Sequence, residues 1–319
     1  MTNFDVFNGD ADGICALTQL RLAEPCEAVL ITGVKRDIEL LDRVQAGLGD
    51  QVTVLDVAME KNRAELDRLL AAGAEVFYAD HHFAGEIPIS SNLTTLINEA
   101  PEVCTSLLVN GHLKGRFARW AVVGAFGDNL GRSARALASS LDLSENDLAR
   151  LEDLGTYINY NGYGERIEDL HFAPDDLFRL VGRHADPLDF IHDSREHFER
   201  LQDGYYSDMV SAETIVPAQA DSRSAIVILP NQAWARRVSG VYSNELTNRY
   251  PERAHAVLRE KADGGYLVSV RAPLTNRTGA ADLCRQFATG GGRAAAAGIN
   301  HLPTSELTTF IDLFRITYS

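Results

Sequence analysis

With 319 residues, the chain is long enough for about two domains, each able to bury a core of its own. Its 45% hydrophobic and 24% charged residues are typical of globular proteins, and no apolar run approaches the roughly 20 residues that span a bilayer. The start, Met1–Asp5, has neither the basic nor the apolar stretch of a secretory signal. The four cysteines have no short paired spacing, so we expect reduced core residues in a cytoplasmic protein, and neither a zinc knuckle nor disulfides.

The formal net charge of −15 argues against general binding to long duplex nucleic acid, which depends on neutralising phosphates. The charge is unevenly distributed, because residues 223–319 carry +5 and the remainder carries −20. This division suits an acidic, metal-holding domain and a basic, anion-binding one. Uneven surface composition explains the same numbers equally well.

Short β-branched runs alternate with helix-like stretches over the first 130 residues. In chain order, the predicted elements are a strand at Phe4–Phe7, a helix at Ile14–Ala23, a strand at Ala28–Thr32, a helix at Asp37–Leu48, a strand at Val52–Leu55, a helix at Arg63–Ala72 and a strand at Glu75–Ala79. Such alternation implies right-handed crossovers. We therefore predict an α/β fold built on a doubly wound, mostly parallel sheet.

The remainder of the chain divides into a helical connector and a second domain. Residues 134–205 look helical, with a glycine- and aromatic-rich break at Asn159–Gly164. The later predicted strands are Ala225–Leu229, Ala256–Arg259 and Tyr266–Arg271, the last two joined by a turn at Asp263–Gly265. The predicted organisation is a metal-binding catalytic domain with its connector at 1–205, a linker at 206–222, and a smaller mixed α/β substrate-binding domain at 223–319.

Acidic side chains follow the predicted strands at the point where each strand ends. Asp10 and Asp12 come after the first strand, Asp56 after the third, and Asp80-His81-His82 after the fourth. Ligands of an open parallel sheet bind beyond the carboxyl ends of its strands, so these groups are expected to share one rim. Alone, Asp-x-Asp-Gly is usually a turn. The conjunction of these motifs is what indicates a site.

A further acid, Asp128, follows Gly127, a glycine that would let the backbone approach a metal. Four crowded carboxylates would repel one another unless cations lay among them. Carboxylates with one imidazole suit manganese or magnesium better than zinc or copper. Two cations about 3.5–4 Å apart are a common device for attack at phosphorus. Asp56 would bridge them, and His82 would contact the phosphate or protonate the leaving oxygen.

These motifs resemble, in order and spacing, those of the DHH phosphoesterase family, and the resemblance covers most of the chain. The quoted residues are Asn8-Gly9-Asp10-Ala11-Asp12-Gly13, Asp56, Asp80-His81-His82 and Asp128. The family includes RecJ-like exonucleases, oligoribonucleases that act on nanoRNA, nucleotide phosphodiesterases, exopolyphosphatases and family II pyrophosphatases. The resemblance implies a doubly wound catalytic domain followed by a substrate-binding domain.

The resemblance also implies roles for single residues. The manganese ligands would be Asp10, Asp12, Asp56, His81 and Asp128. His82 would lie near the scissile phosphate, and Asp80 would support the histidines. Many members carry a histidine or an aspartate ahead of the paired acids, where this chain has Asn8, a neutral candidate ligand.

The second domain resembles the substrate-binding domain associated with that family. Gly290-Gly291-Gly292-Arg293 looks like its glycine-rich loop, and Arg271 resembles the arginine of the strand before that loop. Consecutive glycines let backbone N–H groups surround an anion, and the start of a following helix would favour negative charge. The family normally has a histidine where Arg293 stands, although arginine also binds phosphate. We expect the active site in the cleft between the two domains.

Other polar and aromatic residues are weaker candidates. Arg236, Arg237 and Arg277 would extend a phosphate-binding surface or form an ordinary solvated face. The segment Tyr160–Tyr163 would stack a nucleobase or form a packed loop. Neither choice is decided by the sequence.

The sequence predicts a manganese-dependent phosphodiesterase or phosphatase that acts on small nucleotides, with Mg²⁺ or Co²⁺ as the alternative cations. Short oligoribonucleotides, dinucleotides, cyclic dinucleotides and 3′-phosphonucleotides are the expected substrates. An exopolyphosphatase or inorganic pyrophosphatase would need the same metal site. A catalytically weak, nucleotide-binding regulator is the alternative from another class. No membrane partner is expected, and formation of a homodimer stays open.

Overall fold

The computed structural model describes residues 1–318; Ser319, the end of the predicted second domain, lies outside them. The chain divides into two units, Met1–Asp203 and Gly204–Ser319. The predicted α/β class is confirmed, since the first unit contains a parallel sheet and the second a mixed one. Among residues 1–318, no helix combines the length and the apolar character needed to cross a bilayer.

The first unit alternates strands and helices before it becomes helical. Its strands are β1 (Asn3–Phe7), β2 (Val29–Ile31), β3 (Gln51–Leu55), β4 (Glu75–Asp80) and β5 (Leu93–Ile97). Its helices are α1 (Ala11–Ala23), α2 (Arg63–Ala71), α3 (Thr105–His112), α4 (Ala118–Gly127), α5 (Gly131–Ala138), α6 (Glu145–Gly162), α7 (Pro174–Val181), α8 (Pro187–Asp193) and the start of α9 (Arg195–Glu213). Short 3-10 turns are η1 (Leu40–Arg43), η2 (Met59–Asn62) and η3 (Ile167–Asp169).

Five parallel strands form the first sheet in the order β2-β1-β3-β4-β5. β1 and β3 are largely buried, as expected for strands covered on both faces. The strand order changes direction between them, because β2 lies on one side of β1 while β3, β4 and β5 lie on the other. Such a switch point leaves a crevice at the carboxyl ends of the two strands. Asp10 and Asp56 follow these two strand ends.

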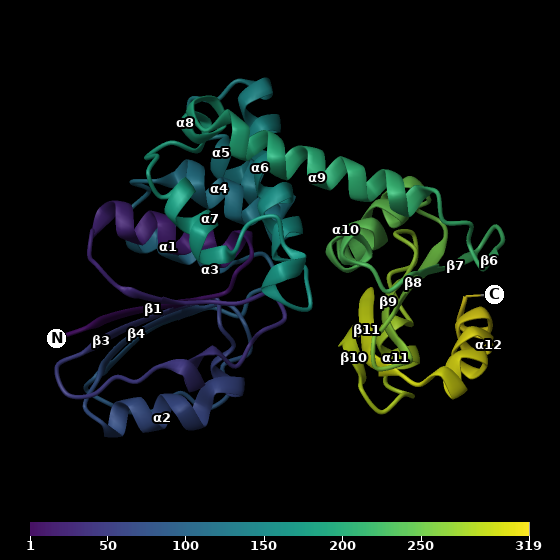
Figure 1. The fold of residues 1–319 in the computed structure, drawn as a ribbon, viewed down its shortest axis with the longest axis horizontal. Helices are drawn as coiled ribbons and strands as arrows, with labels where there is room; N and C mark the ends of the chain where they lie inside the picture. The colour runs from purple at the N-terminus through teal and green to yellow at the C-terminus, as the bar shows by residue number, and fades with distance from the viewer. Residues whose placement is uncertain (319) are drawn as a thin grey trace. The chain divides into compact units, whose positions relative to one another are not determined.

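Helices cover both faces of this sheet (Figure 1). One face packs against η1, η2 and α2 through an apolar cluster that includes Val54, Leu66 and Val76. The other face carries α1, α3 and α7 (Figure 1), where the ring of Phe7 lies 5.6 Å from that of Phe178. These two layers of helices fix the positions of the strand ends that the acidic residues follow.

The helix predicted at Asp37–Leu48 is wrong. Only η1 is helical there, although the apolar spacing of the segment fits a helix. Leu40 and Leu41 are adjacent in sequence and both fully buried in the same cluster, and the N–H of Leu41 donates to the side chain of Asn62 at 3.2 Å. Tertiary contacts thus take the place of helical hydrogen bonds.

The break predicted at Asn159–Gly164 is also wrong, since α6 continues to Gly162. The side-chain oxygen of Asn161 accepts backbone N–H groups from residues 171–172 at 3.0 and 3.1 Å. A Cβ atom on Gly162 would come within 3.1 Å of the Cα atom of Asp10. These residues therefore allow α6 to pack closely against the turn after β1, and they do not interrupt the helix.

The second unit has its own six-stranded sheet. Its strands are β6 (Gln219–Ala220), β7 (Ser224–Leu229), β8 (Ala254–Glu260), β9 (Tyr266–Arg271), β10 (Gly290–Arg293) and β11 (Ala296–Leu302). Its helices are α10 (Ala233–Arg249), α11 (Ala280–Cys284), the 3-10 turn η4 (Thr304–Glu306) and α12 (Leu307–Thr317). The strand order is β10-β11-β9-β8-β7-β6; β7 and β8 are parallel, and the other neighbouring pairs named in this order are antiparallel. The predicted hairpin between β8 and β9 is present.

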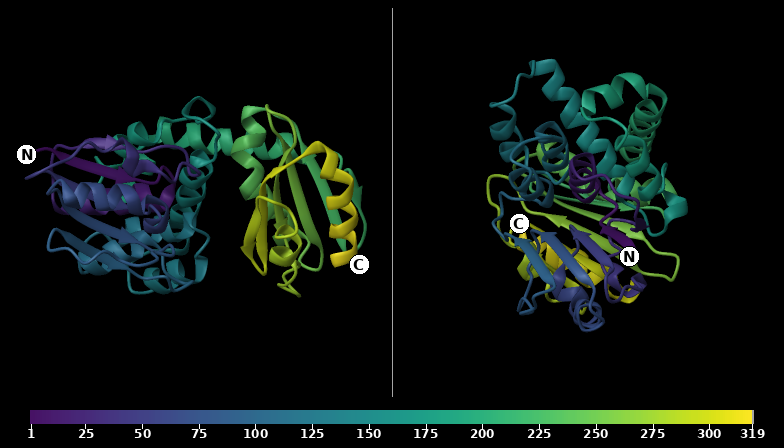
Figure 2. Two further views of the ribbon diagram at one scale, coloured as in Figure 1. Left: turned by 90° about the horizontal axis from the view of Figure 1, so that it is seen from below. Right: turned by 90° about the vertical axis from the view of Figure 1, so that its left-hand side faces the viewer.

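The two faces of the second sheet carry different helices (Figure 2). α11 and α12 cover one face through a cluster that includes Val268, Phe310 and Phe314. α10 covers the other face, with Val238 and Val257 in a separate cluster. The strands of this unit alternate between the two clusters, as the two-residue period of β-structure requires.

The segment expected as a linker, 206–222, is partly helical, because α9 continues to Glu213. Two contacts explain why this part of the expected linker is helical. Asp208 forms an ion pair with Arg237 at 2.7 Å, and Met209 packs in the cluster beneath α10. The division between the units falls at Asp203 and Gly204, inside α9.

Candidate metal centre

Asp10 begins α1 directly after the turn that follows β1. Its Oδ1 atom accepts the backbone N–H groups of Asp12 and Gly13 at 3.0 and 3.1 Å, the usual role of a helix N-cap. The helix therefore starts at Ala11, earlier than the predicted Ile14. The side-chain oxygen of Asn8 accepts the N–H of Asp10 at 3.2 Å, which makes the turn compact.

Asp12 lies fully buried in the first turn of α1. Its two carboxylate oxygens accept the backbone N–H groups of Thr105 and Ser106, both at 2.7 Å. These residues begin α3, whose first N–H groups have no partner within the helix. Asp12 consequently fixes the start of α3 against α1. The sequence did not indicate this role, because the partners lie more than ninety positions away.

Asp56 follows β3 with a left-handed backbone, φ +60°. Left-handed conformations are uncommon for residues other than glycine and cost about 1–3 kcal/mol. They persist where surrounding contacts impose them, often at functional sites. Here the N–H of Asp56 donates to the carbonyl of Ala79 at 3.1 Å, and its Oδ1 accepts the hydroxyl of Thr105 at 3.2 Å. The carboxylate is therefore directed into the rim.

His81 brings the predicted acids together. Its Nε2 atom lies 3.5 Å from Asp56 Oδ1, 3.8 Å from Asp128 Oδ2 and 3.9 Å from Asp12 Oδ2. These acids come from the end of β3, the end of α4 and the start of α1. The rim predicted from the strand ends thus exists as a cluster of side chains. Whether these residues bind a metal stays a prediction.

His82 is oriented by Asp80. The Nδ1 atom of His82 lies 2.8 Å from Asp80 Oδ1, and its ring lies 4.5 Å from that of His81. Burial lowers the pKa of His82, but the hydrogen bond and charge of Asp80 outweigh that effect and raise the pKa above its ordinary value. His82 is 45% exposed, so it is the more accessible of the two histidines. Asp80 supports His82 directly.

Asp128 follows the last residue of α4, Gly127, at the C-cap. Gly127 has a packing role that the sequence did not indicate, and its expected closeness to a metal stays a prediction. A Cβ atom there would come 2.3 Å from the Cβ of Ala11 and 2.8 Å from the carbonyl oxygen of Gly155. Gly127 therefore permits close packing of α4 against α1 and α6, and this packing positions Asp128.

Two acids of the cluster, Asp56 and Asp128, resist ionisation. Burial and the neighbouring carboxylates of Asp12 and Asp10 raise the pKa of Asp56 well above its ordinary value. Burial, offset in part by Lys35, raises the pKa of Asp128 to about 6. Crowded carboxyls of this kind are stabilised when a divalent cation lies among them. The donor set is mostly oxygen with one or two imidazoles, which suits Mn²⁺ or Mg²⁺.

The spacing of the ligand atoms also fits a cation. One ligand atom from each of Asp56, His81 and His82 lies within 4.8 Å of the others. Two neighbouring ligands of one octahedral cation lie about 3 Å apart when metal–oxygen distances are about 2.1 Å. The separations of His81 from Asp56 and Asp128, 3.5 and 3.8 Å, need only a small contraction. The residues therefore fit a divalent cation.

Lys35 is a member of the rim that the sequence analysis missed. Its Nζ atom lies 2.5 Å from Asp10 Oδ2 and 2.8 Å from Asn159 Oδ1. Burial lowers the pKa of Lys35, but the charge of Asp10 raises it well above the ordinary value. The residue lies four positions after β2, at the same end of the sheet as the acids. The strand-end rule could have identified it, had the rule been applied to cations as well.

The glycine-rich segment of the second unit is a strand. Gly290–Arg293 forms β10 and pairs with β11, so the expected anion-binding loop with a following helix is wrong. A Cβ atom on Gly290 would lie 1.7 Å from the carbonyl oxygen of Cys284, and Gly292 has φ +134°. The glycines at 290 and 292 are therefore required by close packing and by backbone conformation. Gly291 has open space around it.

Arg293 and Arg271 nevertheless lie in one row. Arg293 pairs with Ala296 across β10 and β11, and Ala296 pairs with Arg271 across β11 and β9. Residues opposite each other in neighbouring strands point to the same face. The Nε atom of Arg271 donates to Asn244 Oδ1 at 2.9 Å, while Arg293 is exposed. Two guanidinium groups thus share a face on which Ala296 and Gly298 leave little side-chain bulk.

Two of the weaker candidates, Tyr160 and Arg237, interact with other residues of the protein. Tyr160 is fully buried and its hydroxyl lies 2.9 Å from His171 Nε2, so it is not available to stack a nucleobase. Arg237 forms the ion pair with Asp208, and it is not part of an open phosphate-binding surface.

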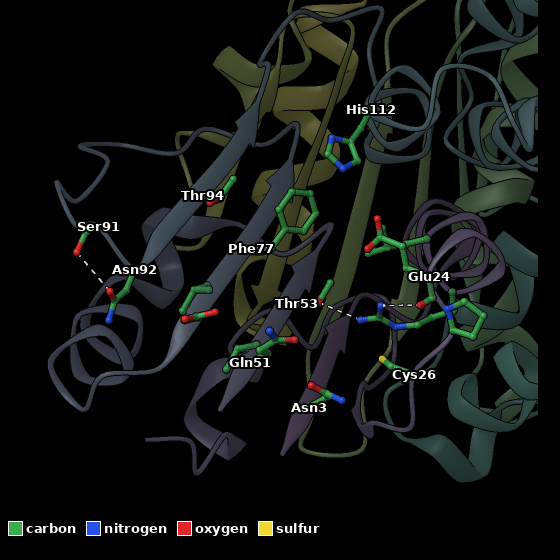
Figure 3. A pocket seen from close by; sticks show the side chains of 16 residues that line it. Asn3, Glu24, Cys26, Gln51, Thr53, Phe77, Ser91, Asn92, Thr94 and His112 are labelled. Carbon is green, nitrogen blue, oxygen red and sulfur yellow. Dashed lines mark hydrogen bonds between the residues drawn. The ribbon is translucent and has the colours of Figure 1, made fainter. Parts of the chain in front are cut away.

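A pocket of about 530 Å³ opens at the other end of the first sheet (Figure 3). It is lined by residues at the start of β1, β3 and β4, such as Asn3, Gln51 and Glu75. Its arginine, Arg21, is already paired with Asp5 at 2.5 Å. The acidic cluster follows the opposite ends of these strands, so the pocket is separate from the candidate centre.

Comparison with protein-family models and with curated proteins finds no match. Solved structures do match. An exonuclease RecJ bound to manganese has a TM-score of 0.62 at 17% identity, covering 99% of this chain and 90% of that one. A pGpG-specific phosphodiesterase, PggH, from Vibrio cholerae has a TM-score of 0.57 at 14% identity over 99% of both chains. An exopolyphosphatase-related protein from Bacteroides fragilis has a TM-score of 0.54 at 15% identity, covering 99% and 91%.

Together with the geometry above, these likenesses define the class of fold. The chain has the two-part α/β fold of the DHH phosphoesterases, and the fold predicted from the motif resemblance is confirmed. At these identities the likeness concerns the fold, and the activity is inferred from the site.

Proposed function

We propose that this protein is a divalent-metal-dependent phosphohydrolase that cleaves phosphoric esters of small nucleotides. The observation that carries the proposal is the convergence of Asp56, Asp128 and His81 at the switch point of the sheet. Asp56 reaches this cluster through a strained backbone, which is hard to explain by stability alone. The DHH-type fold of the chain supports the same proposed function.

In the proposed mechanism, Asp56, Asp128 and His81 would hold the cation. A divalent cation there supplies Lewis-acid stabilisation of charge on the phosphoryl oxygens and makes water more acidic. Asp12 acts on the protein itself, since it fixes the start of α3 and thereby places Thr105 against Asp56. The predicted ligand role of Asp12 stays a prediction.

His82 is the proposed proton donor to the leaving oxygen. Asp80 holds its Nδ1 atom, so Nε2 is the nitrogen that faces substrate. The raised pKa increases the fraction of imidazolium near neutral pH, which favours an acid over a base. Asp80 stabilises the protonated ring and fixes its orientation.

Manganese is the proposed cation, supported by the manganese found in the similar exonuclease structures. Magnesium and cobalt have the same preference for oxygen-rich sites. The proposed binding of a small anionic substrate is supported by the row formed by Arg271 and Arg293. The similar exonuclease and pGpG phosphodiesterase favour dinucleotides and short oligoribonucleotides as substrates.

An exopolyphosphatase or pyrophosphatase is the second candidate, favoured by the similar exopolyphosphatase-related protein. Both candidates would use the same acidic cluster. They differ at the substrate-binding row, because a nucleotide needs a surface for its base whereas polyphosphate needs further cations. The nucleotide is favoured because Arg237, a candidate for such a further cation, already forms an ion pair with Asp208.

The remaining expectations are proposals as well. We propose a cytoplasmic location, supported by the four cysteines that form no disulfide. We propose that long duplex nucleic acid and membranes are not partners, given the acidic net charge.

A panel of substrates tests the proposed function. Purified protein would be incubated with dinucleotides, cyclic dinucleotides, 3′,5′-bisphosphonucleotides, short oligoribonucleotides and polyphosphate, each with Mn²⁺, Mg²⁺ or Co²⁺. We expect metal-dependent release of mononucleotides from the dinucleotides or oligonucleotides. Release of phosphate from polyphosphate alone would favour the second candidate. Nucleotide binding without any hydrolysis would favour a regulator.

A further inference from the structure

Hydrogen bonds to the N–H and to the carbonyl of Lys35 hold its backbone in place. Its N–H donates to the carbonyl of Gly162 at 2.8 Å, at the end of α6. Its carbonyl accepts the side-chain amide of Asn8 at 3.3 Å, in the turn after β1. Since both partners belong to elements that form the rim, the position of the Lys35 side chain is set by the fold.

The ammonium group of Lys35 lies among oxygen atoms, as a bound cation would. Its two oxygen partners, Asp10 Oδ2 at 2.5 Å and Asn159 Oδ1 at 2.8 Å, belong to buried residues. The ring of Tyr163 completes the surroundings, with its centroid 5.3 Å from Nζ. Side chains from two segments, the start of α1 and the end of α6, therefore enclose one positive charge.

The residues that would have to bind a second cation already form hydrogen bonds or ion pairs with other groups of the protein. Asp10 has one oxygen bonded to backbone N–H groups and the other to Lys35. Asn8, the neutral residue at the position where related motifs carry an acid or a histidine, uses its oxygen for the N–H of Asp10 and its amide for Lys35. By contrast, Asp56 Oδ1 and Asp128 Oδ2 lie 3.5 and 3.8 Å from the same atom, His81 Nε2.

We propose that the ammonium of Lys35 takes the place of one of the two expected cations, so that the centre binds a single divalent cation at Asp56, Asp128 and His81. The inference rests on the proposed metal-dependent function and concerns the number of cations. Two cations in such sites lie about 3.5–4 Å apart. A second cation at Asp10 would have to displace the ammonium or accept strong repulsion from it. Lys35 thus supplies a positive charge that chelators cannot remove.

The wild-type protein gives the first test. Equilibrium dialysis against Mn²⁺, followed by elemental analysis, should find one manganese per chain at saturation. Electron paramagnetic resonance of the loaded protein should show the hyperfine pattern of an isolated manganese ion. Two manganese ions per chain with the spectrum of an exchange-coupled pair would overturn the inference and leave the proposed function intact.

Variants give the second test. Lys35→Met removes the ammonium, and Asn8→Asp in the same chain restores an acid at the rim. We expect this double variant to bind two manganese ions per chain, whereas Asn8→Asp alone still binds one because the ammonium remains. Lys61→Met is the matched control, since Lys61 is 53% exposed and pairs with the neighbouring Glu60 at 3.3 Å; this variant should bind one manganese ion.

The outcomes separate the two proposals. A double variant that is folded by circular dichroism and still binds one manganese would overturn the assignment of Lys35 to the second cation position. A wild-type protein that binds no divalent cation would overturn the metal-dependent function, and the inference with it. If the double variant does not fold, the stoichiometry and spectrum of the wild-type protein decide the question.

Discussion

The acidic rim of the first unit and the arginine row of the second unit are built in opposite ways. The acids are buried, and backbone groups hold them: Asp10 caps α1, Asp12 anchors α3 and Asp56 has a left-handed backbone. The arginines lie on one sheet face, where Arg293 is exposed and Arg271 is held by the side chain of Asn244.

The difference follows from the energy of burying charge. A buried carboxylate costs several kcal/mol unless hydrogen bonds or cations compensate it, so the rim needs a fixed partner for each acid. An exposed guanidinium keeps its hydration and needs no such support. We therefore expect substitutions at the rim to change stability or abolish activity, and substitutions in the row to change affinity.

The largest effect is expected for Asp56→Asn. Loss of one carboxylate from the proposed cation site should lower kcat by about a thousandfold. Stability should be retained, because asparagine also tolerates the left-handed backbone and one crowded charge is removed. Steady-state kinetics with thermal unfolding checks both parts. Turnover close to that of the wild type would remove Asp56 from the site.

Asp12→Asn tests whether Asp12 stabilises the fold through its hydrogen bonds to the start of α3. An amide oxygen can accept only from one side, and its NH₂ group would face the other backbone N–H at the start of α3. We expect a loss of about 2–3 kcal/mol in the free energy of unfolding, measured by urea denaturation. An unchanged free energy of unfolding would mean that the bonds to Thr105 and Ser106 are not important for stability.

Arg293→Ala should mainly raise KM, by about tenfold, because one charge-assisted contact with a phosphate is worth about 1.4 kcal/mol. The value of kcat should change little. Arg285→Ala is the matched control, since Arg285 is 64% exposed and lies 3.9 Å from Asp282. If both variants have the wild-type KM, the row does not bind substrate.

The smallest effect at neutral pH concerns His255, which pairs with Arg271 in the same row but is buried. Burial, reinforced by Arg253, lowers the pKa of His255 to about 4. The unfolded chain, with a pKa of about 6.5, binds more protons, so stability falls as the pH decreases from about 6.5 towards 4.

Hydrogen exchange of β8 and β9 at pH 7 and pH 5 measures this effect. The wild-type strands should lose protection at pH 5 relative to a His255→Phe variant, which has no proton to bind. Equal loss of protection in both proteins would assign the pH dependence to other groups.

Much of the rim was predictable because its signals are local. Strands β1, β3 and β4 are short apolar runs, and the acids that follow them reach the same edge in any parallel sheet. The failures have non-local causes. The helix predicted at Asp37–Leu48 is absent because the side chain of Asn62 and a buried cluster compete with it. The glycines of β10 looked like an anion-binding loop, yet Gly290 allows that strand to pack on α11 and Gly292 adopts a positive φ.

The sequence by itself determined the alternation of strands and helices and the order of the acids along the rim, since both depend on residues within a few positions of one another. Only the tertiary structure decided what each acid contacts. Asp12 meets the start of α3, Asp10 meets Lys35, and Asp56 meets His81, because partners distant in sequence become neighbours when the sheet forms. Charged side chains interact according to the distance between them in the folded protein. The number of residues that separates them in the sequence does not determine that distance.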